Sequence, residues 1–259
     1  MGAVEERAHR NFCDYLRWTS RLDPAIALLD EHGIMALRGP SDFPTSRTAN
    51  RVDASLPATE WVDRVDAFLA EGGKTACVNA RVGADDDITD VLLDRGFREW
   101  STSPEMVCDH ELEARPAPDG VTTRFASTPA DISAYARVVA ESFAHLMLPE
   151  DISLAAIDHP AEFLATDSFV ALAEIDGAVV AGAQGVVLGT GDITYVSWVA
   201  CTNAARGRGL GDTVTRAVTN EAFARGANLV TLEASHFGEH TYARMGYREL
   251  YRYRMLLRL

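Results

Sequence analysis

Apolar positions in the second half of the chain recur with a period of two or in short unbroken runs, a pattern typical of β-strands. Five stretches have this character: 121–126, 169–175, 178–188, 192–201 and 228–234. Most of them follow one another directly, and sequential strands usually become neighbours in a sheet. The pattern therefore predicts one central, mostly antiparallel sheet in this half.

Helical spacing of apolar residues lies between some of these strands. The segment 128–144 begins with Thr128 and Pro129, a pair typical of a helix N-terminus. Further helical patterns cover 149–165 and 238–245, and another follows a glycine-rich loop. Because helices are inserted after the first and fourth strands, we expect a mixed α/β fold.

Turn signals mark the connections between strands. Asp176 and Gly177 separate two of the predicted strands, and this dipeptide favours a tight hairpin turn. The final stretch, 247–259, is interpreted as a closing hairpin.

A short pattern occurs twice in the chain. Residues 90–100 resemble residues 240–250, with a glycine and an Arg-Glu pair at the same places in each. Upstream of the first copy, a helical pattern at 61–69 and a strand-like stretch at 75–80 parallel the order in the second half. We interpret this as a duplicated unit.

Prolines, a glycine and charged residues crowd the segment 113–120, which is the composition of an exposed connection. We expect a first domain at 1–115, a linker at 116–120 and a second domain at 121–259. The second domain carries all of the candidate chemistry below.

The chain has 259 residues, 47% of them hydrophobic, and a formal net charge of -14. The length suits one large domain or two ordinary domains with packed cores. The negative charge disfavours a nucleic acid or an anionic membrane as partner and suits a small cationic molecule. No apolar run approaches the roughly 20 residues of a membrane span, and the first residues do not resemble a signal peptide. We therefore expect a cytoplasmic protein.

The cysteines form no recognisable site. They lie at Cys13, Cys77, Cys108 and Cys201, with no CxxC pair and no Cys/His cluster of zinc spacing. We expect reduced thiols and no metal site.

The segment from Arg206 to Gly211 reads RGRGLG and joins a strand to a helix. The first N–H groups of a helix lack internal partners and carry partial positive charge, and glycines let an anion approach them. Arg206 and Arg208 add groups that bind phosphate oxygens. The loop therefore predicts a site for a phosphate-bearing ligand.

Three known phosphate loops compete for this segment. A Walker A loop is excluded, because no Gly-Lys-Ser/Thr follows. A dinucleotide loop lacks its third glycine, since Asp212 stands there, although Glu233 ends the next strand where such a fold places its ribose acid. The third candidate, Arg/Gln-x-x-Gly-x-Gly/Ala, is matched by Arg206, Gly209 and Gly211.

That motif is the pyrophosphate loop of the GNAT acyltransferase superfamily, which the second half of the chain resembles. The resemblance covers about residues 121–259 and includes the order of strands around the loop and the later sequence YARMGY. It implies a duplicated GNAT fold, with strands four and five splayed apart and a degenerate first copy. It also implies acetyl-CoA as acyl donor.

The resemblance assigns the residues that bind this donor. The pyrophosphate is expected on the loop, and the pantetheine arm is expected along strand four. Ser235 stands where the family often has an asparagine, which weakens the hydrogen bonding expected there. The expected binding residues are Val199, Cys201, Arg206, Gly207, Arg208, Gly209, Leu210, Gly211, Asp212 and Ser235.

Two catalytic roles follow from the same resemblance. Tyr242 is expected to be the general acid that protonates the departing thiolate, and the backbone N–H of Cys201 is expected to stabilise the oxyanion. The sulfur of Cys201 is interpreted as inert. Tyr195 and Ser197 share one strand face with Val199 by the period of two, and they are expected to line the acceptor pocket.

The general base stays unassigned by the sequence. The family's strand-four glutamate is replaced by Tyr195. A water chain is one alternative, and the other candidates are Glu141, His145, Glu174, Asp192, His236 and His240.

The first half lacks a phosphate loop, because its matching segment, 52–61, contains no glycine. We therefore expect one acetyl-CoA per chain. One interpretation of the irregular stretch 37–52 is a loop that reaches over the acceptor pocket. The equal alternative is that the first half only buries the sheet edge and completes the core.

The predicted function is an N-acetyltransferase that acts on the primary amine of a small molecule, as a monomer or homodimer. The alternatives are a protein or peptide N-acetyltransferase and a catalytically idle acyl-CoA-binding module.

Overall fold

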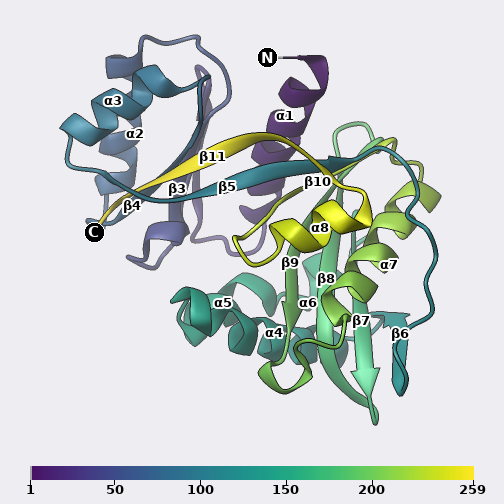
Figure 1. Ribbon diagram of the computed structural model, residues 1–259. Helices are drawn as coiled ribbons and strands as arrows, with labels where there is room; N and C mark the ends of the chain where they lie inside the picture. The colour runs from purple at the N-terminus through teal and green to yellow at the C-terminus, as the bar shows by residue number, and fades with distance from the viewer. Residues whose placement is uncertain (1) are drawn as a thin grey trace. The chain divides into compact units, whose positions relative to one another are not determined.

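The computed structural model describes residues 2–259, which fold into two compact units (Figure 1). The first unit comprises residues up to Met106, together with Glu233–Glu239 and Glu249–Leu259. The second comprises Val107–Leu232 and His240–Arg248. Each compact unit therefore includes part of the C-terminal segment of the chain. The domain boundary expected at 116–120 stays a prediction.

The first unit contains helices α1 (Ala3–Thr19), α2 (Ala58–Ala70) and α3 (Asp86–Asp94), with α2 and α3 packed together (Figure 1). Its strands lie in the order β1-β2-β3-β4-β11-β5. The strand bounds are β1 (Ala27–Glu31), β2 (Ile34–Arg38), β3 (Arg47–Arg51), β4 (Ala76–Arg81), β5 (Arg98–Cys108) and β11 (Arg248–Arg258). Trp61, Val65 and Leu256 lie in its buried core.

The interpretation of 37–52 as a loop is wrong, because this stretch contains β3, whose five residues are all buried between β2 and β4. A 3-10 helix, Pro44–Ser46, precedes it. The sequence of β3, RTANR, is polar, yet its first arginine finds hydrogen-bond partners in the core. Arg47 donates to the backbone carbonyls of Leu69, Glu71 and Thr75.

The predicted closing hairpin is also wrong. Residues 248–258 form the single strand β11, which pairs antiparallel with β4 from Tyr253–Arg81 to Arg258–Ala76. The segment contains no glycine, proline, asparagine or aspartate at which the strand would turn. With no turn residue to interrupt it, the segment continues as one strand.

The repeated sequence pattern has the same local structure in both places. Helix α3 ends before Gly96, and helix α8 (Glu239–Met245) ends before Gly246. Both glycines have positive φ, 89° and 119°, and each leads into a strand, β5 or β11. Only glycine adopts this conformation readily, so the shared glycine follows from the shared turn.

The second unit has its strands in the order β10-β9-β8-β7-β6. The strands are β6 (Val121–Phe125), β7 (Ser168–Ile175), β8 (Ala178–Leu188), β9 (Ile193–Cys201) and β10 (Leu229–Glu233). All neighbouring pairs are antiparallel except β9 and β10, which are parallel. The prediction of a mixed, mostly antiparallel sheet is confirmed.

Helices cover both faces of this sheet. The helices are α4 (Pro129–Phe143), α5 (Glu150–Ile157), α6 (Pro160–Phe163) and α7 (Leu210–Ala224), with 3-10 turns at Ala144–Leu146 and Asn203–Ala205. A Cβ at Gly182 would meet the ring of Tyr135 on α4, and one at Gly185 would meet Val218 on α7. Because these glycines have opposite parity on β8, α4 and α7 pack on opposite faces.

Strand β9 contains a β-bulge that the sequence pattern did not predict. Gln184 of β8 pairs with Ser197, whereas Gly182 pairs with Ala200, so β9 has one extra residue between these pairs. Trp198 has a φ of 51°, and its carbonyl accepts a hydrogen bond of 2.7 Å from the Tyr135 hydroxyl. The bulge resets the alternation of faces. The expectation that Val199 shares a face with Ser197 is therefore wrong.

Strands β9 and β10 separate toward their carboxyl ends. Their parallel register runs from Ile193–Leu229 to Tyr195–Thr231, whereas β9 continues to Cys201. The end of β9 therefore has no partner strand from β10, which is the splay expected from the resemblance.

Candidate functional site

The glycine loop makes the turn between β9 and α7. Gly207 and Gly209 both have a φ of 78°, and Gly209 is the N-cap of α7. A residue with a Cβ is strained in this region, so two of the three glycines are required by backbone conformation. The first N–H groups of α7 begin immediately after this turn.

Gly211 needs a different explanation. It lies in the first turn of α7 with ordinary helical geometry, and a Cβ at this position would meet no atom within 4 Å. Glycine lowers helix stability by about 1 kcal/mol relative to alanine. Since neither conformation nor packing requires Gly211, the open space above its backbone points to the approach of another molecule.

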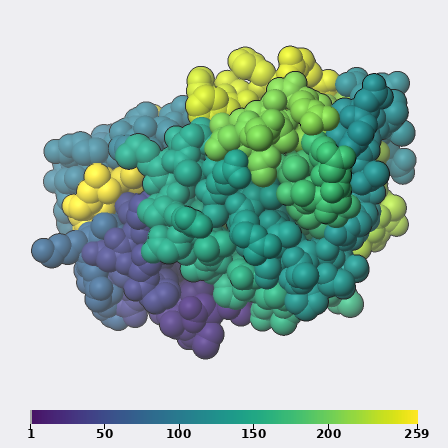
Figure 2. All heavy atoms as spheres, turned by 90° about the horizontal axis from the view of Figure 1, so that it is seen from below, coloured from purple at the N-terminus to yellow at the C-terminus, as the bar shows by residue number. Residues whose placement is uncertain are grey.

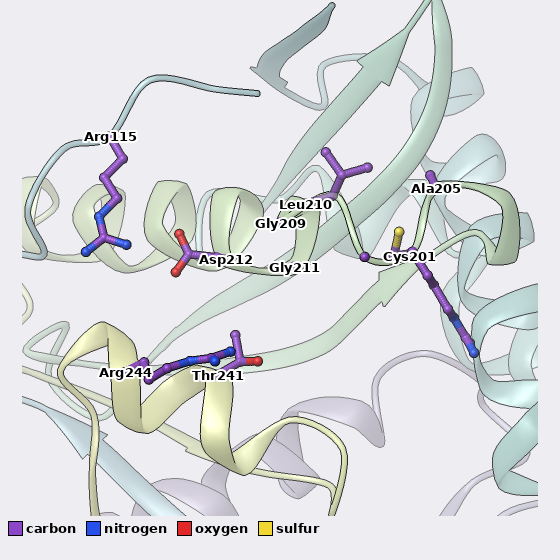
Figure 3. A pocket seen from close by; sticks show the side chains of 11 residues that line it. Arg115, Cys201, Ala205, Gly209, Leu210, Gly211, Asp212, Thr241 and Arg244 are labelled. Carbon is purple, nitrogen blue, oxygen red and sulfur yellow. The ribbon is translucent and has the colours of Figure 1, made fainter. Parts of the chain in front are cut away.

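That space belongs to a cavity of about 730 Å³. Figure 3 shows it between the first turn of α7 and helix α8. Seven of the residues predicted to bind the donor line it: Cys201, Arg206, Gly207, Gly209, Leu210, Gly211 and Asp212. The structure therefore brings together the loop and the end of β9.

Arg206 is tied to helix α4. Its guanidinium donates hydrogen bonds of 3.0 Å to the backbone carbonyl of Ser142 and to Nδ1 of His145. In the space-filling view, the teal surface of α4 to α6 and the bright-green surface of the loop and α7 adjoin one another (Figure 2). The motif arginine thus holds the loop against α4 as well as lining the cavity.

Arg208 lies outside the residues that line the cavity. Its guanidinium is 3.4 Å from the Asp119 carbonyl, in the segment before β6. Asp212 lines the cavity, but its carboxylate is held by Arg216 at 2.7 and 3.2 Å. This ion pair neutralises the one carboxylate of the loop and so limits its repulsion of an anion.

The backbone N–H of Cys201 points away from β8. The N–H of the next residue, Thr202, donates to Val180 on the β8 side, and successive strand amides alternate. The Cys201 N–H instead lies 3.3 Å from Oγ of Ser142, a long contact for such a bond. Burial raises the pKa of the Cys201 thiol, which keeps the sulfur protonated and unreactive.

Tyr242 lies on α8 between two cavity-lining residues, Thr241 and Arg244, but does not itself line the cavity. Its ring packs against Tyr247 at a centroid distance of 6.0 Å. Within residues 2–259, its hydroxyl makes no hydrogen bond. Burial raises the pKa of Tyr242, so the phenol stays protonated at neutral pH.

The two predicted acceptor-site residues differ in exposure. Tyr195 is buried at 3% exposure, beside Val186 and Thr231 in the sheet. Ser197 is half-buried and donates a hydrogen bond of 2.8 Å to Gln184. Neither residue lines the cavity at the loop.

Val199 is half-buried next to the bulge of β9, and Ser235 belongs to the first compact unit. The Ser235 side chain is exposed, and its carbonyl accepts hydrogen bonds from the backbone of Gly238 and Glu239. Neither Val199 nor Ser235 is among the residues that line the cavity at the loop.

Several candidate bases have structural partners. The Glu141 carboxylate accepts the Asn203 N–H at 2.7 Å, and Glu174 pairs with Arg124 at 2.7 Å. Asp192 accepts from the Thr190 hydroxyl at 2.9 Å. His145 contacts Arg206, whereas His236 and His240 are exposed. The general base stays unassigned.

Four cavity residues were missed by the sequence argument: Arg115, Ala205, Thr241 and Arg244. Arg115 precedes β6 in the segment that we interpreted as a connection, Ala205 ends the 3-10 turn before the loop, and Thr241 and Arg244 lie one turn apart on α8 (Figure 3). Thr241 and Arg244 are polar residues three positions apart, a spacing that places both on one face of a helix. That spacing could have identified them from the sequence. No sequence pattern could have identified Arg115, because only folding brings its segment to α7.

The described chain, residues 2–259, contains no cluster of three or more histidine, cysteine or acidic side chains that would hold a metal ion. Among the same residues, none of the helices combines the length and apolar character needed to cross a membrane.

Comparisons with known proteins agree with this geometry. The acetyltransferase (GNAT) family matches residues 136–247. A search of curated proteins finds no match.

Solved structures with a similar fold cover nearly the whole chain. A GCN5-related N-acetyltransferase from Kribbella flavida is 21% identical with a TM-score of 0.70, covering 96% of this chain and 94% of its own. One from Sphaerobacter thermophilus is 18% identical with a TM-score of 0.63, covering 89% and 82%. A tandem GNAT protein from the clavulanic acid biosynthesis pathway is 14% identical with a TM-score of 0.61, covering 100% and 96%.

The family match includes α7 with its glycine loop, and the structural likeness extends over both halves of the chain. Residues 136–247 therefore form a domain of the acetyltransferase (GNAT) family, within a chain that has the fold of GNAT N-acetyltransferases.

Proposed function

We propose that this protein is an N-acetyltransferase that uses acetyl-CoA and acetylates the primary amine of a small molecule. The observation that carries the proposal is the cavity at the start of α7, where bare glycine backbone and arginines meet the free end of β9. Helix N-termini of this kind bind phosphate groups. The GNAT match supports an acyltransferase in which that phosphate belongs to coenzyme A.

The residues of the cavity would hold the donor from its pyrophosphate to its thioester. The amides from Gly207 to Asp212 would bind the pyrophosphate, and Arg206 would keep the loop in place through Ser142. The unpaired edge of β9, including Val199 and Cys201, offers backbone groups to an extended arm. The donor supplies a thioester whose acetyl group is transferred.

The chain's own groups would then assist attack by the amine nitrogen on the acetyl carbon. The Cys201 N–H faces away from β8, and its long contact with Ser142 is easily exchanged for the acyl oxygen. A donor placed at a developing oxyanion contributes about 3 kcal/mol. As the C–N bond forms and the C–S bond breaks, the Tyr242 hydroxyl would give its proton to the leaving sulfur.

The raised pKa of Tyr242 suits an acid that must be protonated before the reaction. Its hydroxyl is available, because no neighbour within the described residues uses it. The amine must lose a proton as it becomes an amide, and the structure assigns no side chain to that step.

The acidity of the chain favours a cationic acceptor, because a net charge of -14 attracts amines before they bind. Peptide acceptors and an idle acyl-CoA-binding module are the alternatives. We place the reaction in the cytoplasm, since all four cysteines are free thiols.

The test is release of free thiol from acetyl-CoA in the presence of amines, amino acids, aminoglycosides and peptides. Turnover with a small amine supports the proposal, and turnover with peptides alone favours the first alternative. Binding of acetyl-CoA without turnover favours an idle module, and absence of binding overturns the proposal.

A further inference from the structure

Two arginines in the cavity have no strong partner in the protein. Arg244 makes no hydrogen bond and no ion pair with any of residues 2–259. Arg115 has an ion pair with Glu113 at 3.8 Å, and both side chains are more than half exposed. By contrast, the guanidiniums of Arg206 and Arg216 are used by the fold. Arg115 and Arg244 are therefore available to a ligand.

The position of Arg115 is set by α7, although the segment around it has no regular structure. On its N-terminal side, Leu112 exchanges backbone hydrogen bonds with the Asn220 side chain at 2.8 and 3.0 Å. The adjacent Glu113 carbonyl accepts from Arg216 at 3.0 Å. These contacts fasten the segment to α7 and direct Arg115 to the cavity, where Figure 3 shows it above Asp212.

Arg244 approaches the same cavity from α8, on the other side of the first turn of α7 (Figure 3). Thr241 lies one turn earlier on the same helix face and adds a hydroxyl. The Asp212 carboxylate between them is neutralised by Arg216. This end of the cavity therefore carries two uncommitted positive charges, in a chain with 38 acidic and 24 basic residues.

Arg115 and Arg244 come from segments other than the glycine loop on which the pyrophosphate is expected. Coenzyme A carries a second anionic group, a phosphate monoester on its ribose, and such a group has about -1.5 to -2 charges at neutral pH. Two guanidiniums match that charge, and arginine is well suited to binding phosphate oxygens. Without local positive charge, the acidic protein would repel the ligand.

We propose that Arg115 and Arg244, with Thr241, form a subsite for the ribose 3′-phosphate, so that the protein selects coenzyme A over its dephosphorylated form. The inference rests on the proposed function, because it requires coenzyme A as ligand. It gives the segment before β6 a role in choosing the donor.

Calorimetric titration with coenzyme A and with 3′-dephospho-coenzyme A tests this on the full chain. We expect wild-type protein to bind the dephosphorylated form about tenfold more weakly. Arg115→Ala and Arg244→Ala should each weaken coenzyme A binding by roughly three- to tenfold and leave binding of the dephosphorylated form unchanged. The double variant should bind the two ligands equally.

Arg137→Ala is the matched control, since Arg137 is an exposed arginine of α4 that does not line the cavity. It removes the same charge and should preserve the discrimination. Equal binding of both ligands by wild type overturns the subsite while leaving the proposed function intact, as does equal weakening of both ligands in the variants. Failure of wild type to bind either ligand overturns the proposed function itself.

Discussion

The guanidinium of Arg206 donates a hydrogen bond of 3.0 Å to the backbone carbonyl of Ser142, in the last turn of α4. Arginine near the C-terminal end of a helix satisfies a carbonyl that has no helical partner and opposes the negative end of the helix dipole. The first residue of the phosphate motif therefore joins two elements of the fold. Its main effect on ligand binding is to hold the loop.

Arg206→Ala should consequently weaken binding of coenzyme A and of 3′-dephospho-coenzyme A by the same factor, because the loop amides lose their fixed position. Loss of the hydrogen bond should also lower the free energy of unfolding by about 1 kcal/mol. Calorimetry with both ligands and thermal denaturation measure these effects. Selective loss of affinity for the phosphorylated ligand would show that Arg206 acts as a direct contact to the ribose phosphate.

Gly211→Ala should separate folding from binding. Because the added methyl group meets no protein atom and removes a glycine from a helix, stability should rise by about 0.5 to 1 kcal/mol. The same methyl group blocks the approach of a pyrophosphate, so the Kd for acetyl-CoA should rise at least tenfold. Thermal denaturation and calorimetry on one preparation test both.

Gly209→Ala is the comparison for this variant, since its φ of 78° makes a side chain costly to the fold itself. It should lower both stability and affinity. An unchanged Kd in Gly211→Ala would contradict the placement of the phosphate.

Tyr242→Phe should lower kcat by about 10² to 10⁴ and leave the KM for acetyl-CoA nearly unchanged, because only the proton donor is lost. Steady-state kinetics of thiol release give both constants. Tyr247→Phe is a matched control in the same aromatic pair. It removes a buried hydrogen bond of 2.7 Å to Thr219 and should cost stability, about 1 kcal/mol, while kcat is retained. Full activity of Tyr242→Phe would exclude the acid role.

Each chain should bind one acetyl-CoA, through its second unit. In the first unit, the N-cap of α2 is Pro57, and the preceding turn is closed by the Asp53 carboxylate, which accepts the Ser55 N–H at 2.8 Å. An internal carboxylate there repels a phosphate. Calorimetry should return a stoichiometry near one per chain, and a second site of similar affinity would contradict the assignment.

Stability of the first unit should fall as the pH drops from about 6.5 toward 4. Burial, reinforced by Arg81, lowers the pKa of His9 to about 4, and its ring nitrogens contact the Tyr253 hydroxyl at 2.7 Å and the Arg51 carbonyl at 2.8 Å. The unfolded chain binds a proton near pH 6.5 that the folded chain does not bind, so acid favours unfolding. The effect of this histidine amounts to at most about 3 kcal/mol.

Chemical denaturation at a series of pH values measures that dependence. His9→Gln keeps polar atoms for both partners but does not titrate, so its stability should change less between pH 6.5 and 4. Identical pH dependence in wild type and variant would show that other groups are responsible.

The sequence predicted most elements of the second unit because their signals are local. Thr128 caps α4 through its side chain, with Asp131 completing the capping box. Asp176 and Gly177 both have positive φ, as a tight hairpin turn requires. Strand β3 was missed, since its buried Arg47 is satisfied by carbonyls that are distant in the chain, those of Leu69, Glu71 and Thr75.

By itself, the sequence determined the glycine loop and the start of α7, because backbone conformation and helix initiation depend on adjacent residues. The resemblance of this motif and its surroundings to a known family gave the expectation of a GNAT acetyltransferase. Only the tertiary structure decided which side chains meet at the loop. The bulge in β9 depends on pairing with β8, and the positions of Arg115 and Arg206 depend on hydrogen bonds to α7 and α4. Such contacts join residues far apart in the chain, and no periodicity or spacing records them.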